Sequence, residues 1–125
     1  MTRKVLIVDD SKLARMAVAK VLNALHPDWA SIEAANAEQA LACVKQEAPD
    51  FVLLDFNMPG KDGLALAGEL RSLNPSLHVA VISANHQIEV VKRAQAAGAA
   101  FLRKPLTEQA LAEFLNGARG NGAQA

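Results

Sequence analysis

The sequence lacks an excess of charge of either sign, because 13 lysines and arginines balance 13 aspartates and glutamates. A basic surplus of the kind that draws proteins onto nucleic acids or anionic membranes is therefore missing. A helix-turn-helix pattern is missing too, which argues against direct binding to DNA. We expect neither nucleic acid nor membrane as a partner, so any electrostatic function must come from a local group of charges.

Long apolar runs and cysteine pairs are also absent. The apolar stretch after Lys4 ends at two aspartates, so it is neither a signal peptide nor a membrane span. Cys43 is the single cysteine, which excludes an internal disulfide and favours a cytoplasmic location. The three histidines are scattered, and no two have the i and i+4 spacing of a helical metal site.

What the sequence does contain is an alternation of apolar and amphipathic segments. A chain of 125 residues, 51% of them hydrophobic, can bury one core. Short apolar runs predict buried strands at residues 4–8, 31–35, 51–54, 78–82 and 100–102. Helical spacing and capping residues predict helices at residues 11–25, 36–47, 64–73, 87–97 and 107–116.

The strict alternation predicts an α/β fold with a doubly wound parallel sheet of five strands. Each right-handed crossover places its helix against the sheet, so helices should cover both faces. We expect one domain over residues 1–116, with no room for a fused output domain. Residues 117–125 are small or polar and should form a disordered tail.

Polar residues follow the ends of four predicted strands. Asp9 and Asp10 follow the first strand, Asp55 the third, Ser83 the fourth and Lys104 the fifth. In an open parallel sheet the carboxyl ends of the strands form the ligand-binding edge, so these side chains should converge there. Each residue alone could simply cap a helix or turn, or be a solvated charge. Together they predict a site.

Three carboxylates close together repel one another and call for a cation. Only oxygen ligands are available, which favours a hard ion such as Mg²⁺, an ion that commonly accompanies phosphate. Lys104 can then supply a fixed positive charge and Ser83 a hydroxyl donor for phosphoryl oxygens, and Asp55 is the best-placed nucleophile. The aspartates at positions 9 and 10 and the absence of Gly-x-Gly-x-x-Gly argue against a nucleotide cofactor.

Four motifs now stand after the right strands and in the right order: VDDS from Val8, LLDFNMPGKDG from Leu53, ISA from Ile82 and FLRKP from Phe101. Together they resemble the receiver domain of bacterial response regulators over about residues 4–116. The resemblance implies the flavodoxin-like, CheY-like strand order 2-1-3-4-5. It also implies a histidine kinase or phosphotransfer protein as phosphodonor.

The resemblance assigns the chemistry residue by residue. Asp55 matches the aspartate that takes the phosphoryl group. Asp9 and Asp10 match the acidic pair that holds Mg²⁺, and the backbone carbonyl of Asn57 matches a further ligand. Lys104 matches the lysine that contacts the phosphoryl group. The transfer then needs little beyond positioning and charge neutralisation, within a signalling domain that also undergoes autodephosphorylation and is not a conventional enzyme.

The resemblance further implies a switch. Ser83 matches the hydroxyl that moves toward the new phosphate, and Phe101 the aromatic residue that fills the vacated space. Pro105 matches a proline that follows a cis peptide bond. The change would remodel the face around the fourth helix, fifth strand and fifth helix, which contacts the downstream protein. Asn57 and Asn85 occupy positions that tune hydrolysis of the acyl phosphate.

Alternatives remain at this stage. A phosphatase of the haloacid dehalogenase type needs an acid two residues after its nucleophile, where this chain has Asn57. A receiver-like scaffold that works without phosphorylation usually lacks an acid or the lysine, and here both are present. Chemotaxis-like signalling, phosphorelay transfer and regulation of a separate enzyme are all open as outputs. Phe101 has no hydroxyl where chemotaxis members have tyrosine.

Overall fold

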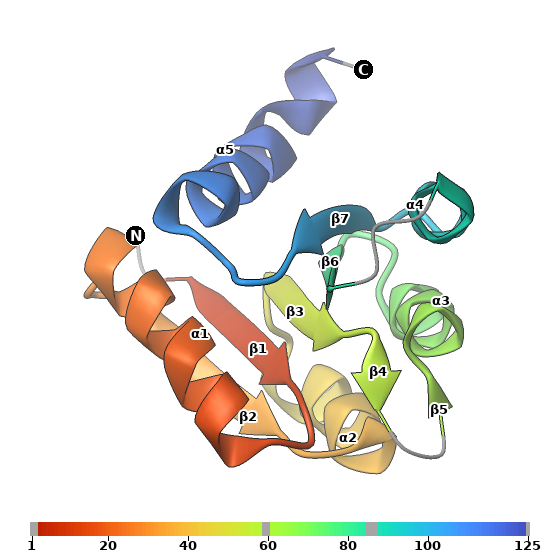
Figure 1. Cartoon of the computed structure of the whole chain (residues 1–125), viewed down its shortest axis with the longest axis horizontal. Helices are drawn as coiled ribbons and strands as arrows, with labels where there is room; N and C mark the ends of the chain where they lie inside the picture. The colour runs from red at the N-terminus through yellow and green to blue at the C-terminus, as the bar shows by residue number, and fades with distance from the viewer. Residues whose placement is uncertain (1–2, 59–60, 85–87, 125) are drawn as a thin grey trace.

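The computed structural model describes residues 3–58, 61–84 and 88–124, and for residues 57–58, 61–62 and 117–124 the description is of the backbone alone. The main sheet has five parallel strands in the order β2-β1-β3-β6-β7 (Figure 1). Their bounds are Lys4–Val8 (β1), Ala30–Ala34 (β2), Phe51–Asp55 (β3), His78–Ser83 (β6) and Ala100–Arg103 (β7). Counted along the chain, these strands confirm the predicted order 2-1-3-4-5.

In the part of the chain that the structure describes, five helices connect and cover these strands. Their bounds are Lys12–Leu25 (α1), Ala37–Glu47 (α2), Gly63–Leu73 (α3), Ile88–Ala96 (α4) and Glu108–Gln124 (α5). Helices α1 and α5 lie on one face of the sheet and α2, α3 and α4 on the other (Figure 1). Among the described residues, no helix is both long and apolar enough to span a membrane.

Successive strand residues point to opposite faces of the sheet and so supply a hydrophobic core on each face. In β1, Val5 and Ile7 pack toward α1 and α5, whereas Leu6 and Val8 pack toward the opposite helices. All four side chains are buried, which is why the strand reads as an uninterrupted apolar run. Two apolar layers therefore fix the sheet, and its polar residues are left to the edges.

The helix starts follow the capping signals of the sequence. The side chain of Ser11 accepts a hydrogen bond from the N–H of Ala14, at 3.2 Å. Asn36 accepts from the N–H of Gln39 at 2.8 Å, and the Gln39 side chain accepts from the N–H of Ala35 at 2.7 Å. The bonds from the N–H groups of Ala14 and Gln39 satisfy amides that the first helical turn leaves without partners.

Two predictions of local structure differ from the structure. The segment after Asp55 was expected to be one long turn, but it contains two-residue antiparallel strands, β4 (Asn57–Met58) and β5 (Lys61–Asp62). Such short strands depend on pairing with each other and leave no apolar signature. Helix α5 is assigned as far as Gln124, beyond the expected helix end near Asn116. Its first turn begins as expected, with Thr107 accepting a hydrogen bond from the N–H of Ala110 at 3.1 Å.

Candidate functional site

Three aspartates meet at the carboxyl edge of the main sheet. Asp9 and Asp10 directly follow β1, and Asp55 is the last residue of β3. One carboxylate oxygen from each lies within 4.8 Å of the others. Asp9 and Asp55 are buried, with 6% and 5% of their surface exposed, whereas Asp10 is exposed. The predicted convergence of these residues is therefore present in the fold.

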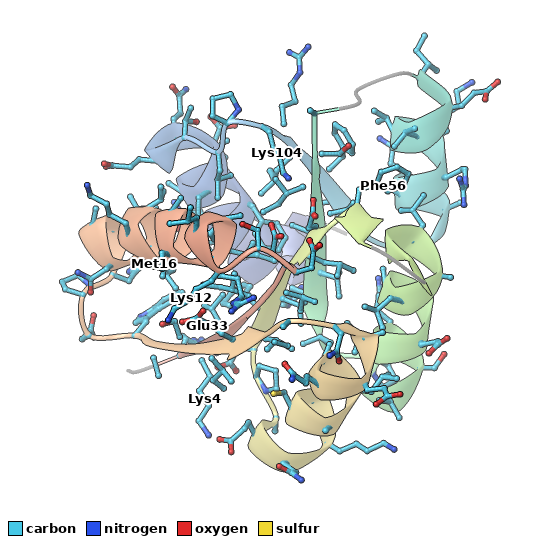
Figure 2. The ribbon with its side chains drawn as sticks, turned by 60° about the horizontal axis from the view of Figure 1, so that its bottom comes forward. Lys4, Lys12, Met16, Glu33, Phe56 and Lys104 are labelled. Atoms are coloured by element: carbon cyan, nitrogen blue, oxygen red, sulfur yellow. The ribbon has the colours of Figure 1, made fainter. Side chains whose placement is uncertain are left out.

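Lys104 joins the cluster from the loop after β7. Its Nζ lies 2.9 Å from Asp55 Oδ1, and Figure 2 shows it at this edge of the sheet. Asp55 Oδ1 is buried, and within the described part of the chain it accepts no hydrogen bond. Its contact with Lys104 is therefore an ion pair that lacks the geometry of a hydrogen bond. A buried carboxylate oxygen normally has hydrogen-bond donors or a cation around it. The arrangement thus fits a site that receives a further positively charged group.

The pKa of Asp9 shows that bringing these carboxylates together costs electrostatic free energy. Burial raises the pKa of Asp9 above its ordinary value of 3.8, and the charge of Asp55 and a hydrogen bond with Asp10 add to the rise. The N–H of Ser11, 2.9 Å from Asp9 Oδ1, and the charge of Lys104 lower the pKa without cancelling the rise. The charged form of Asp9 is therefore disfavoured relative to a free aspartate, and a hard divalent cation among the carboxylates would offset this cost.

These residues fit a magnesium ion by their chemistry. They offer carboxylate oxygens and, within the described residues, no imidazole or thiolate belongs to the cluster. Carboxylates that keep several waters are the usual protein partners of Mg²⁺. Asn57 lies in β4, two residues beyond Asp55, so its backbone belongs to the same edge. Asn85 falls outside the described residues.

The two residues of the predicted switch lie on neighbouring strands. Ser83 ends β6 and is fully buried, and its backbone carbonyl accepts a hydrogen bond from the N–H of Lys104 at 3.1 Å. Phe101 pairs with Val81 in the β6–β7 register and is partly buried against the core beneath α2, α3 and α4. The peptide bond between Lys104 and Pro105 is cis. The hydrogen bond from the Lys104 N–H therefore links the strand end at Ser83 directly to the lysine.

An apolar cavity of about 420 Å³ opens beside the carboxylates. It lies between α1 and the loop after β7, and its floor is formed by strand residues. Its lining includes Asp9 and Asp55 together with apolar side chains such as Val18, Leu53 and Leu106. An apolar wall of this kind lowers the local dielectric, in agreement with burial as the main cause of the raised pKa of Asp9.

One residue at this edge was not predicted from the sequence. The guanidinium of Arg15 donates a hydrogen bond to the backbone carbonyl of Asp9, at 2.6 Å. A sequence signal does exist, because a cation near the amino end of a helix is disfavoured by the helix dipole and suggests a specific partner. That signal does not say which group the side chain reaches.

The fold and the site define a class: a doubly wound α/β domain whose carboxyl edge holds buried aspartates and a lysine. The chain matches the family model of the response regulator receiver domain over residues 5–116. It is 32% identical over 99 residues to sporulation initiation phosphotransferase F of Bacillus subtilis, covering 79% of this chain and 78% of that protein. It is 33% identical to the chemotaxis protein CheY of Thermotoga maritima, covering 93% and 97% of the two chains.

Solved structures agree with these relatives. A CheY-like receiver domain from Methanospirillum hungatei aligns over the full length of both chains with a TM-score of 0.86 at 22% identity. The chemotaxis protein CheY4 of Vibrio cholerae aligns over 93% of this chain and 98% of that chain, with a TM-score of 0.82 at 26% identity. By contrast, the chain spans about half of the nitrate/nitrite response regulator NarL of Escherichia coli, 52% of its length. The chain belongs to the response regulator receiver domain family.

Proposed function

We propose that the chain is a phosphoacceptor switch of a two-component system or phosphorelay. An oxygen of Asp55 attacks the phosphorus of a phosphohistidine on a kinase or phosphotransfer protein. A P–O bond forms while the P–N bond breaks, and the product is an acyl phosphate on Asp55. The observation that carries this proposal is the buried Asp55 carboxylate, which lies beside Lys104 and the acidic pair at the ligand-binding edge of the sheet.

Asp9, Asp10, Asp55 and the backbone carbonyl of Asn57 would hold Mg²⁺. When bound, the ion neutralises charge on the phosphoryl oxygens. The short distance among the carboxylates supports this assignment, as does the pKa of Asp9, which burial and the charge of Asp55 raise when no cation is present. Lys104 would exchange its ion pair with Asp55 for one with the phosphoryl group, which keeps its charge compensated during the reaction.

Ser83 and Phe101 would convert this chemistry into a change of surface. The Ser83 hydroxyl turns toward the phosphoryl group, and Phe101 fills the space on the neighbouring strand. The half-buried position of Phe101 supports such a movement, because the side chain has one side in the core and one side toward solvent. The face formed by α4, β7 and α5 then binds the downstream protein, and Phe101 contributes no hydroxyl to that contact.

The names of two relatives support action through contact with other proteins. The CheY relative of Thermotoga maritima is covered to 97% and is named as a chemotaxis protein. The Bacillus subtilis relative is named as a phosphotransferase of sporulation initiation. Signalling of either kind would occur in the cytoplasm, where the free Cys43 can remain reduced.

The functional unit would be residues 1–116, a range that contains the residues 5–116 matched by the family model. Residues 117–125 include glycines at positions 117, 120 and 122, and glycine has a low helix propensity. A chain that ends after Asn116 should therefore keep its midpoint of thermal unfolding and its phosphorylation. A loss of either would assign residues 117–125 to the folded unit.

The decisive experiment is intact-protein mass spectrometry after incubation with acetyl phosphate, with and without Mg²⁺. The wild type should gain one phosphoryl group only when Mg²⁺ is present. Asp55→Asn should gain none, while Asp28→Asn, which makes the same change at an exposed loop position, should behave as the wild type. Circular dichroism of each variant establishes that the fold is intact.

Failure of the folded wild type to react would contradict the proposal and favour a receiver-like scaffold that acts by binding alone. Modification that persists in Asp55→Asn would move the acceptor to another residue. Lys104→Ala should still bind Mg²⁺, because Lys104 contacts Asp55 and is not an expected metal ligand. It should react more slowly with acetyl phosphate, since it lacks the positive charge that compensates the phosphoryl oxygens.

A further inference from the structure

Arg15 makes two charge-assisted hydrogen bonds beneath the acidic cluster. Its Nη1 donates to the backbone carbonyl of Asp9 at 2.6 Å, and its Nε donates to Glu33 Oε1 at 2.8 Å. Only 13% of the Arg15 side chain is exposed, although it is charged. Glu33 lies on β2, and Figure 2 shows it beside α1 near the same edge of the sheet. The guanidinium thus joins three elements: α1, β2 and the loop after β1.

Together with two other hydrogen bonds, the bond from Arg15 holds Asp9 in place. The N–H of Asp9 donates to the carbonyl of Ala34 at 3.1 Å, and its carboxylate accepts from the N–H of Ser11 at 2.9 Å. Its carbonyl accepts from Arg15. All three polar groups of Asp9 therefore have partners on different parts of the fold. Of these three bonds, the one from Arg15 is made by a side chain, so a substitution can remove it without altering the other two directly.

The charge of Arg15 has the wrong sign for a direct role toward a cation. A positive group near the acidic cluster repels Mg²⁺, so its removal should tighten binding if charge alone mattered. Glu33 offsets this repulsion, since its carboxylate pairs with the guanidinium at 2.8 Å. A role in positioning predicts the opposite sign, because a loop that is no longer held must be ordered when the ion binds.

We infer that Arg15, held by Glu33, is a positioning residue of the acidic site. It fixes the loop that carries Asp9 and Asp10, so that both face Asp55 before any ion arrives. The inference rests on the proposed magnesium site, and it assigns to Arg15 a role in the affinity for the ion. Groups that orient metal ligands typically change metal affinity by about 10-fold to 100-fold when they are removed.

The test measures Mg²⁺ affinity by isothermal titration of the full chain with MgCl₂. Arg15→Gln should bind about 10-fold more weakly than the wild type. Lys12→Gln is the matched control, because it removes one positive charge from an exposed position in the first turn of the same helix. Lys12→Gln should bind Mg²⁺ as tightly as the wild type or more tightly.

A second readout separates positioning from chemistry. With acetyl phosphate, Arg15→Gln should need about 10-fold more Mg²⁺ for half-maximal modification, yet reach a near wild-type rate at saturating Mg²⁺. Arg15→Lys keeps the charge but lacks the guanidinium fork that reaches both acceptors. Its affinity for Mg²⁺ should therefore lie between those of the wild type and Arg15→Gln. Arg15→Lys also serves as the test if Arg15→Gln does not fold.

The outcomes have distinct meanings. Wild-type affinity in Arg15→Gln, or in Arg15→Lys where that is the tested variant, overturns the inference while the magnesium site stands. Tighter binding than wild type overturns it as well and assigns Arg15 a purely electrostatic effect. Absence of Mg²⁺ binding by the folded wild type removes the magnesium site itself, and the inference fails with it.

Discussion

Carboxylates at the two edges of the main sheet lie in opposite environments. At the amino edge, Asp50 accepts a hydrogen bond from the N–H of Lys4 at 3.0 Å and pairs with Arg3 at 3.6 Å. It is half exposed, so water shares in its solvation. At the carboxyl edge, Asp9 and Asp55 are buried and lie beside further negative charge.

Packing differs between the edges as well. At the amino edge Phe51 is 2% exposed and contacts three aromatic rings, with centroid distances of 5.7 Å to Trp29, 5.6 Å to His78 and 5.9 Å to Phe114. At the carboxyl edge the cavity beside Asp55 leaves apolar side chains partly uncovered. The amino edge therefore contributes tighter packing to the fold, whereas the carboxyl edge gives up packing at the proposed site.

The largest effect on stability is expected at Phe51. Phe51→Ala should lower the free energy of unfolding by about 3–5 kcal/mol, because it removes a fully buried ring and leaves a cavity among its aromatic neighbours. Urea unfolding without Mg²⁺ measures the change. The comparison is Phe56→Ala, the same substitution at a partly exposed position of the carboxyl edge. It should lower the free energy of unfolding clearly less. Equal losses would contradict the difference in packing between the edges.

Substitution of an aspartate should have opposite signs at the two edges. Asp9→Asn should stabilise the metal-free protein by about 1 kcal/mol, since it relieves repulsion among close carboxylates. Asp50→Asn should destabilise it by a similar amount of about 1 kcal/mol, because Asp50 loses charge-assisted partners. Urea unfolding in the presence of EDTA measures both. A destabilised Asp9→Asn protein would show that the acidic cluster supports the apo fold.

The gain in stability from Mg²⁺ should increase as the pH rises. The folded, metal-free protein has a raised pKa at Asp9, so the stability that this proton contributes is present below 3.8 and is lost as the pH rises through the folded pKa. Mg²⁺ binds the carboxylate form, so protons compete with it at low pH. At about 100 times the Kd the ion should add roughly 2.7 kcal/mol at neutral pH.

Thermal unfolding with and without Mg²⁺, from acidic to neutral pH, checks this dependence. Asp9→Asn is the control, since it removes the titrating group along with one expected ligand. Its gain from Mg²⁺ should be small at every pH. A wild-type gain that does not change with pH would exclude competition between the ion and a proton in the cluster.

Much of the fold could be predicted because its signals are local. Uninterrupted apolar runs mark strands buried on both faces, and capping residues such as Asn36 and Thr107 mark helix starts. The strand ends could be located as well, so that the convergence of Asp9, Asp55 and Lys104 followed from the geometry of parallel sheets. The strand order itself came from a family resemblance and not from the pattern of residues.

The features that escaped prediction depend on specific pairing and side-chain contacts, some of them distant in sequence. The strands β4 and β5 are two residues long and form only by pairing with each other. The bond from Arg15 to the Asp9 carbonyl depends on a side-chain conformation that Glu33 stabilises, 18 residues further along the chain. The aromatic contacts of Phe51 join the loop before β2, the start of β6 and helix α5. None of these has a periodic signature.

The smallest effect is expected at the exposed ion pair of the amino edge. Lys4 Nζ lies 3.6 Å from the carboxylate of Glu47, and both side chains are about half exposed, at 46% and 49%. Lys4 also donates to the backbone carbonyl of Glu47 at 3.2 Å, a bond that substitution of the Glu47 side chain leaves in place. Glu47→Gln should therefore change the free energy of unfolding by less than about 0.5 kcal/mol.

Urea unfolding at low and high salt checks this small value. An exposed pair is screened by salt, so any difference between Glu47→Gln and the wild type should shrink further as the ionic strength rises. A loss as large as that of Asp50→Asn would mean that exposed pairs also determine the stability of the amino edge. The different effects of substitutions at the two edges would then come from the sign of the neighbouring charges alone. Burial of the carboxylates would not explain them.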